Sequence, residues 1–201
     1  MLSLWITNIY IFVLALTLAV LEIQIEGREG WAKNLPTWRP RPDSRTAVIF
    51  SKIMSGRETT GYHITMFAFV FLIFYFPYAF GIIFLTPANF LATLSLFFLF
   101  IVLWDFLWFV LNPHYPLKNF KKEHIWWHKK WLLGLPRDYY FSTSLSLLMA
   151  LLAGFYSVYG GFGLWWWLLN LSMFLAEIAA AVLFTLYVLD IDNWRVDGRR
   201  F

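Results

Sequence analysis

Residues 88–112 read "ANFLATLSLFFLFIVLWDFLWFVLN", an almost unbroken apolar run that carries one acidic residue, Asp105. About 20 consecutive apolar residues are enough to cross a hydrocarbon core of about 30 Å as an α-helix. A carboxylate within such a span costs free energy unless it is paired, and it is a functional candidate by default. The stretch therefore predicts a transmembrane helix with a functional polar group inside it.

Apolar stretches of similar length recur along the chain. Of its 201 residues, 60% are hydrophobic, 22% aromatic and 14% charged, a balance that indicates a membrane protein. The expected transmembrane helices cover residues 4–26, 62–85, 88–112, 139–159 and 162–191. The first of them lacks a preceding Lys or Arg and a small-residue cleavage site, so we expect a permanent helix rather than a signal peptide. The sequence predicts an all-α integral membrane protein in which residues 1–201 form a single polytopic domain.

The basic residues predict the orientation of these helices. All 16 Lys and Arg residues fall within 28–57, 118–137 and 195–200. Five spans put these stretches on one side, which the positive-inside rule makes cytoplasmic. We therefore expect an N-terminus outside, a cytoplasmic C-terminus, and cytoplasmic loops at 27–61 and 113–138. Basic residues placed in this way signal topology and suit contact with anionic membrane lipids, and they argue against a nucleic acid as partner.

The sequence lacks the residues and motifs that several common catalytic and binding sites require. The chain has no cysteine, which excludes disulfides, thiolate metal sites and a cysteine nucleophile. It also has no Gly-rich phosphate loop, no dinucleotide fingerprint and no G-x-S-x-G elbow. Any chemistry must therefore depend on histidines and carboxylates.

The second cytoplasmic loop contains "EHIWWHKKW" at 123–131. If residues 117–131 form a helix, with about 100° per residue, one stripe roughly 80° wide collects its apolar residues and both histidines. The stripe consists of Leu117, Phe120, His124, Trp127, His128 and Trp131. The pattern predicts an interfacial amphipathic helix between the third and fourth spans, with both histidines facing inward. In the first loop, Trp31, Trp38 and Phe50 predict an ordered segment that packs over the cytoplasmic ends of the helices.

Acidic and histidine residues are expected to gather at the cytoplasmic ends of the spans. These candidate metal ligands are Glu22, Glu26, His63, Asp105, His114, His124 and His128. Mixed imidazole and carboxylate ligands without thiolate suit iron, as one ion or two, with zinc or manganese as alternatives. Because the outer connections are very short, nearly every polar residue must lie on the cytoplasmic side in any case. A salt-bridged polar cluster without metal therefore stays open as the alternative.

Glu177 is a further candidate within an apolar span, in "FLAEIAAAVLF" at 174–184. It lies about 20 Å along the helix from Asp190, near the middle of the bilayer. One interpretation is a protonated glutamate that hydrogen-bonds to a neighbouring helix. The other is a proton relay or a polar group in a lipid cavity, which makes Glu177 and Asp105 the candidate catalytic residues.

These features favour a membrane-embedded metalloenzyme, a non-haem di-iron oxidase, hydroxylase or desaturase. It would act on a lipophilic small molecule at the cytoplasmic leaflet, with an electron-donor protein or a second copy of the chain as partner. In the gathering of histidines at one membrane face the chain resembles, in general terms, membrane hydroxylases and desaturases, whose H-x-x-H-H boxes it lacks. The alternatives are a zinc- or magnesium-dependent lipid hydrolase or transferase, and a non-enzymatic transporter or accessory subunit whose polar cluster holds no metal.

The predicted orientation can be tested with single introduced cysteines, because the natural chain has none. In intact cells, Asp43→Cys and Asn119→Cys should not react with a membrane-impermeant maleimide added from outside, because both lie in cytoplasmic loops. Thr86→Cys, at an outer turn, should react. The reverse labelling pattern would invert the orientation.

Overall fold

Five long apolar helices build the computed structural model, which describes residues 2–54, 56–157 and 160–193, without the side chains of residues 2, 3 and 192. They are α1 (Leu2–Glu26), α3 (Gly61–Ala79), α4 (Pro87–Leu111), α5 (Arg137–Tyr156) and α6 (Leu164–Leu183). A π-helical stretch, η2 (Phe184–Val188), continues α6, and a 3-10 turn, η3 (Ile191–Asn193), follows it. Each long helix, with η2 counted as part of the last, is apolar enough to cross a membrane. This confirms the predicted helical class and suggests a multi-pass membrane protein.

The helix boundaries follow local signals in the sequence. Thr60 precedes α3 and Thr86 precedes α4, and in each case the threonine Oγ1 accepts a hydrogen bond of 3.2 Å from the backbone N–H three residues later, as N-cap residues do. The expected span 62–85 ends early, at Ala79. Pro77 lies near the end of this helix and Gly81 follows with a φ of 67°, a combination that terminates helices.

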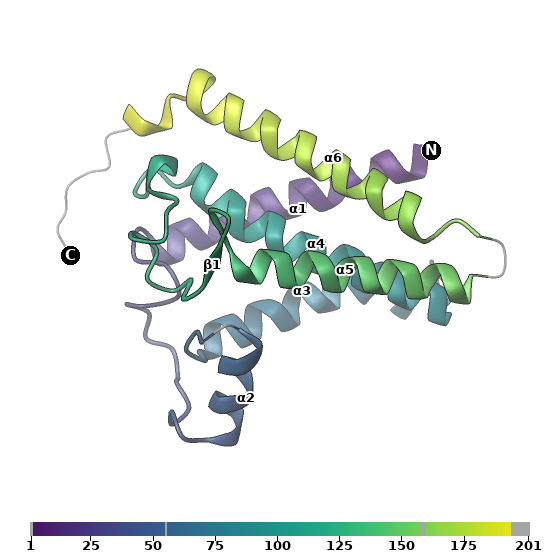
Figure 1. The fold of residues 1–201 in the computed structure, drawn as a ribbon, viewed down its shortest axis with the longest axis horizontal. Helices are drawn as coiled ribbons and strands as arrows, with labels where there is room; N and C mark the ends of the chain where they lie inside the picture. The colour runs from purple at the N-terminus through teal and green to yellow at the C-terminus, as the bar shows by residue number, and fades with distance from the viewer. Residues whose placement is uncertain (1, 55, 158–159, 194–201) are drawn as a thin grey trace.

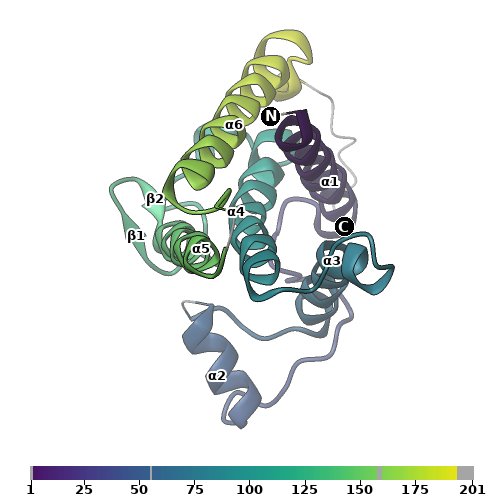
Figure 2. The ribbon, with the colours of Figure 1, turned by 90° about the vertical axis from the view of Figure 1, so that its right-hand side faces the viewer.

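Helix α4 forms the centre of the structure. In its most apolar stretch 56% of the residues are buried, against 28% or less in the other long helices. Figure 2 shows α4 surrounded by α1, α3, α5 and α6. Phe100, Leu103 and Leu107 are almost fully buried along it. The outer helices expose many large apolar side chains, as expected where a bilayer covers the surface.

Buried polar side chains join the helices to one another. Asn8 Nδ2 of α1 donates a hydrogen bond of 2.8 Å to Asn170 Oδ1 of α6. Trp167 Nε1 donates to Ser146 Oγ at 3.0 Å, which in turn donates to the carbonyl of Ser95 at 2.8 Å. Such contacts hold apolar helices together where the hydrophobic effect between them is weak.

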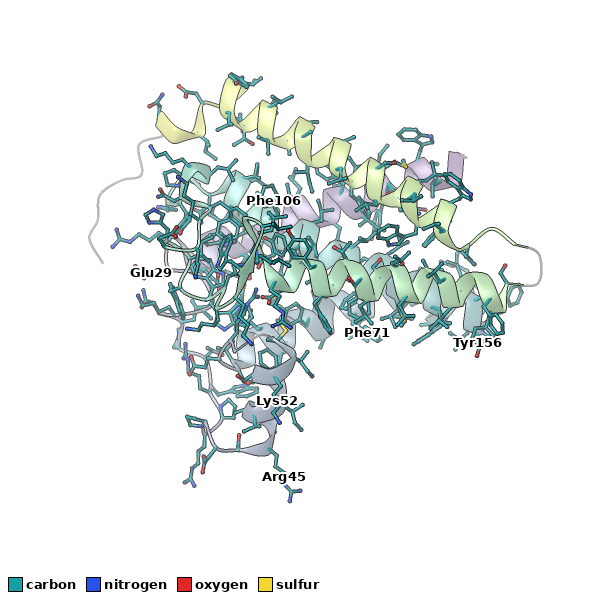
Figure 3. All side chains as sticks on the ribbon, viewed as in Figure 1. Glu29, Arg45, Lys52, Phe71, Phe106 and Tyr156 are labelled. Carbon is teal, nitrogen blue, oxygen red and sulfur yellow. The ribbon has the colours of Figure 1, made fainter. Side chains whose placement is uncertain are left out.

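The two ends of the bundle differ sharply. At one end, here called the turn end, short connections join α3 to α4 and α5 to α6; at the other, the loop end, lie the long connections 27–60 and 112–136 (Figure 1). Glu29 marks the loop end and Tyr156 the turn end (Figure 3). Every Lys and Arg that the structure describes lies at the loop end, in the two connections or at the first residue of α5. The third basic stretch, 195–200, lies outside the described residues.

The interfacial helix expected over 117–131 is not formed. This segment contains a single 3-10 turn, η1 (Leu117–Asn119), then turns, and finally a short hairpin of β1 (Trp131–Leu132) with β2 (Leu135–Pro136). Packing explains the difference, because Trp127 stacks on Phe109 of α4 with ring centroids 5.8 Å apart and an interplanar angle of 7°. Tertiary contacts of this kind override a helical pattern in the sequence.

A short helix lies instead in the first loop, α2 (Arg45–Ile53), capped by Ser44. It extends sideways from the loop end, with Arg45 at the tip away from the five long helices (Figures 1 and 3). Its Ile49 and Ile53 are 58% and 62% exposed. In the same loop Trp31 is buried, as expected, whereas Trp38 is exposed.

Two glycines of the first loop offer a matched test of this packing. Gly27 and Gly30 both have a φ of 62°, but a Cβ would meet open space at Gly27 and the buried Trp127 ring at 2.6 Å at Gly30. Gly27→Ala should lower the free energy of unfolding by about 1–2 kcal/mol through backbone strain alone. Gly30→Ala should lower it by about 1–3 kcal/mol more because Trp127 must move. Equal losses in an SDS titration of mixed micelles would contradict this packing.

Candidate functional site

A cavity of about 240 Å³, here called the inner cavity, lies at the loop end. Its polar wall is formed by Glu22, Glu26, Arg57, His63, Asp105 and Asp138. Its apolar wall includes Phe67, Phe97, Phe98, Ile101, Val102 and Phe141. Along α4, Phe97 lies about 12 Å deeper than Asp105. The cavity thus joins a charged mouth to an apolar interior, as ligand sites for lipophilic molecules do.

Three candidate ligands meet in the wall of this cavity. Glu22 and Glu26 lie one turn apart at the end of α1, and His63 lies in the first turn of α3. One ligating atom from each residue lies within 4.8 Å of the other two. Glu22 and His63 are buried, with 8% and 4% of their surface exposed. We call these three residues the carboxylate–histidine cluster.

Neighbouring groups fix the histidine of the cluster. His63 Nδ1 lies 2.7 Å from Thr60 Oγ1, and its ring stacks on Trp31 with centroids 3.8 Å apart. Nε2 therefore faces the cluster, 3.7 Å from Glu26 Oε1. A hydrogen bond to the second ring nitrogen is the usual way in which proteins orient a metal-ligating histidine.

The two carboxylates of the cluster, Glu22 and Glu26, lack a directly paired Lys or Arg within the part of the chain that the structure describes. Glu26 accepts a hydrogen bond from the backbone N–H of Ala32. Both carboxylates also lie at the C-terminal end of α1, where the helix dipole disfavours anions. Two carboxylates and one imidazole are a ligand set suited to iron, manganese or zinc, and three protein ligands leave positions for water or substrate.

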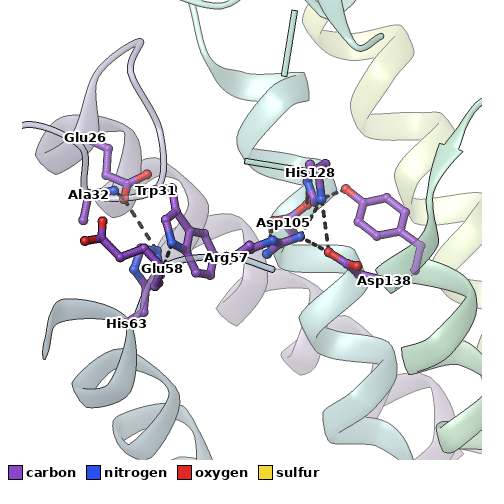
Figure 4. A network of polar contacts seen from close by, with 10 residues as sticks. Glu26, Trp31, Ala32, Arg57, Glu58, His63, Asp105, His128 and Asp138 are labelled. Atoms are coloured by element: carbon purple, nitrogen blue, oxygen red, sulfur yellow. Dashed lines mark hydrogen bonds and ion pairs between the residues drawn. The ribbon is translucent and has the colours of Figure 1, made fainter. Parts of the chain in front are cut away.

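A second group of polar side chains lies beside the cluster (Figure 4). Asp105 Oδ2 accepts a hydrogen bond of 2.6 Å from the Tyr139 hydroxyl and lies 3.1 Å from His128 Nε2. His128 Nδ1 lies 3.3 Å from Asp138 Oδ2. Arg57 pairs with Asp138 through Nη2 and lies 4.0 Å from Asp105 Oδ1 through Nη1. We call these five residues the Arg57 network.

The Arg57 network supplies the partner that a carboxylate in an apolar span requires. The Arg57 side chain is 5% exposed and stands between the two aspartates. Its guanidinium also lies over the Trp31 ring, 4.6 Å from the centroid. Asp105 and His128 are therefore held by Arg57, Tyr139 and Asp138, and they do not belong to the group of three residues whose ligating atoms lie within 4.8 Å of one another.

Two of the predicted ligands lie elsewhere. His114 and His124 are exposed at the loop end, outside the wall of the inner cavity. The predicted inward position of His124 is wrong because the stripe assumed a helix over 117–131. In the folded loop Ile125, Trp127 and His128 take the inward positions.

Glu177 also lies apart from the inner cavity. It stands on α6, which lies across α4 from α3 (Figure 2), and it is not in the cavity wall. Its side chain is half-buried, and Glu177 Oε2 has no hydrogen-bond partner among the described residues. The structure therefore does not bring together the two predicted catalytic residues, Asp105 and Glu177.

The sequence alone did not single out three members of the site. Arg57 is one of many loop cations, and its selection depends on the path of the first loop. Asp138 and Tyr139 open α5, where their sequence positions carry no motif. The one available signal was Asp105 itself, because a carboxylate in an apolar span predicts a cationic or hydrogen-bonding partner.

Comparisons of the chain with protein-family models, with curated proteins and with solved structures each returned no match. The functional argument therefore rests on the residues and geometry of the inner cavity.

Loss of the central cation should destabilise the fold. Arg57→Met should lower the free energy of unfolding by about 2–4 kcal/mol, because it leaves two partly buried carboxylates without their partner. Arg28→Met removes an arginine whose side chain is 75% exposed and should cost less than about 1 kcal/mol. SDS titration in mixed micelles measures both variants. An Arg57→Met loss no larger than that of Arg28→Met would contradict a structural role for the Arg57 network.

Proposed function

We propose that this protein is a membrane-embedded metalloenzyme that binds one metal ion at Glu22, Glu26 and His63 and acts on a lipophilic substrate in the inner cavity. The observation that carries this proposal is the carboxylate–histidine cluster, in which three ligating atoms lie within 4.8 Å of one another. Among the described residues, no Lys or Arg side chain pairs with either glutamate. The cluster borders a cavity whose deeper wall is apolar. Iron is the preferred ion, with zinc or manganese as alternatives.

The proposed reaction class is oxidation, hydroxylation or desaturation by non-haem iron. The bound ion would supply the redox chemistry with dioxygen as the oxidant, and an electron-donor protein docked at the loop end would supply the electrons. A second ion would need ligands such as Asp105 and His128, which are engaged with Arg57, Tyr139 and Asp138. The geometry therefore favours one iron over the pair expected from the ligand count. With zinc in place of iron, the same site would suit hydrolysis or group transfer on a lipid.

The Arg57 network would serve proton transfer beside this centre. Tyr139 and Asp105 both line the inner cavity, and the Tyr139 hydroxyl donates to Asp105 Oδ2 at 2.6 Å. A proton held at this pair lies within reach of a substrate in the cavity. Asp105 is therefore proposed as an acid–base residue, whereas the role of Glu177 stays a separate prediction.

The loop end is proposed to face the cytoplasm, with the N-terminus outside and the C-terminus inside. The one-sided distribution of Lys and Arg supports this orientation. The inner cavity would then open at the cytoplasmic leaflet. Ile53 and Met54, from the end of α2, belong to its wall, so a lipophilic substrate could enter along α2 from the membrane surface.

A non-enzymatic membrane protein is the second candidate, and a specific observation favours it. In the Arg57 network one cation, Arg57, pairs with two carboxylates, Asp105 and Asp138, through direct contacts. A transporter or accessory subunit could retain such a network for structural reasons, with the glutamates protonated and no metal bound. Metal content separates the two candidates.

Metal analysis of purified protein tests the proposal. The natural chain should carry about one ion per molecule, since a buried site of three protein ligands binds metal tightly. Glu22→Gln, Glu26→Gln and His63→Gln should each remove most of it. His114→Gln and His124→Gln should retain it, and so should His128→Gln, because these histidines lie outside the cluster.

Two outcomes would contradict the proposal. Natural protein without stoichiometric metal would favour the non-enzymatic candidate. Full metal content in the Glu22→Gln and His63→Gln variants would place any ion at another site.

A further inference from the structure

A second cavity, of about 260 Å³, lies at the loop end between the first loop and residues 126–129. We call it the outer cavity. Trp31, Arg57 and Trp127 belong to its wall and also to the wall of the inner cavity. The two cavities are therefore neighbours, and a molecule that occupies both must pass along these three side chains.

The wall of the outer cavity contains two basic side chains, of which Arg57 already pairs with Asp138. Its basic residues are Arg57 and Lys129, and its carboxylate is Glu58. Glu58 already pairs with Arg39 at 3.2 Å. Lys129 forms no ion pair with a carboxylate in the part of the chain that the structure describes; its Nζ lies 5.6 Å from the centre of the Trp126 ring. Its Cγ lies 3.4 Å from the position that a Cβ on Gly56 would take, so its stem runs along the first loop.

Two buried polar atoms of this wall lack hydrogen-bond partners among the described residues. They are Nε of Arg57 and Oγ1 of Thr59, in residues that are 5% and 2% exposed. A buried donor without a partner costs about 1–3 kcal/mol, and native proteins contain few of them. An unpaired ammonium group in the wall, beside a buried N–H and a buried hydroxyl that lack partners, suits a ligand rich in acceptor oxygens.

We propose that the outer cavity binds the anionic oxygen-rich headgroup of an amphiphile, such as a phosphate, whose hydrocarbon chain extends into the inner cavity. Lys129 would neutralise charge on the headgroup, and Thr59 would donate a hydrogen bond to it. The chain would run past Trp31 and Trp127 to the apolar residues of the inner cavity. This inference rests on the proposed function, and it names the substrate class: a long-chain anionic lipid that reacts on its chain rather than at its headgroup.

Binding measurements with three probes test this assignment. Isothermal titration of the full chain in non-ionic detergent should use oleyl phosphate, oleyl alcohol and inorganic phosphate. Oleyl phosphate should bind at least about tenfold more tightly than either of the others, a difference of about 1.4 kcal/mol. Lys129→Gln and Thr59→Val should remove most of this advantage and leave oleyl alcohol binding unchanged. Lys130→Gln, a neighbouring lysine outside the wall, should have no effect.

A substitution in the inner cavity tests the path of the ligand's hydrocarbon chain. Val102→Trp fills the apolar wall and should weaken oleyl phosphate binding without changing that of inorganic phosphate. Thermal unfolding of the same sample checks that the variant is folded, and the exposed Lys129→Gln tests the headgroup site whether or not Val102→Trp folds.

Three results would overturn the inference. The first is equal binding of oleyl phosphate and oleyl alcohol. The second is an effect of Lys130→Gln as large as that of Lys129→Gln. The third is binding of inorganic phosphate as tight as that of oleyl phosphate. Metal content of each sample keeps the two claims separate. Headgroup selectivity without metal overturns the proposed enzyme alone, and metal without headgroup selectivity overturns this inference alone.

Discussion

The contact of Arg57 with Asp105 and Asp138 is the interaction on which the loop end depends. Asp105 lies in the central helix, where a carboxylate needs a partner, and Arg57 brings that partner from the first loop. The same guanidinium packs over Trp31, which stacks on His63. One buried cation therefore ties the first loop to α3, α4 and α5 and forms the boundary between the inner and outer cavities.

The four carboxylates of the inner cavity differ in the partners that they contact. Asp105 and Asp138 share Arg57, whereas Glu22 and Glu26 lie close together with His63 and pair with no Lys or Arg among the described residues. Buried charges in proteins are paired, protonated or bound to metal. The residue types of the carboxylate–histidine cluster favour a bound metal, because the His63 imidazole, oriented by Thr60, adds a nitrogen ligand to the two carboxylates.

Much of the fold was predictable because membrane crossing depends on local properties of the sequence. Apolar length placed the five long helices, although α3 ends at Ala79 and not at residue 85 as expected. The proximity of Glu22, Glu26 and His63 was also predictable, since helix connectivity puts the end of α1 and the start of α3 at one level and a spacing of four residues puts both glutamates on one face. The fold of residues 117–131 was not, because aromatic packing of Trp127 against α4 replaced the helical stripe and left His124 exposed. The role of Arg57 depends in the same way on contacts between distant segments.

X-ray absorption spectroscopy of the iron-loaded protein tests the central claim most directly, because it reports the ligands of the ion rather than its presence. The account predicts a shell of oxygen and nitrogen atoms with a single imidazole and no second iron at the distance of about 3.5–4 Å typical of two-metal sites. His63→Gln should remove the imidazole signal. Two or more imidazoles, or scattering from a second iron, would contradict a one-ion centre at Glu22, Glu26 and His63.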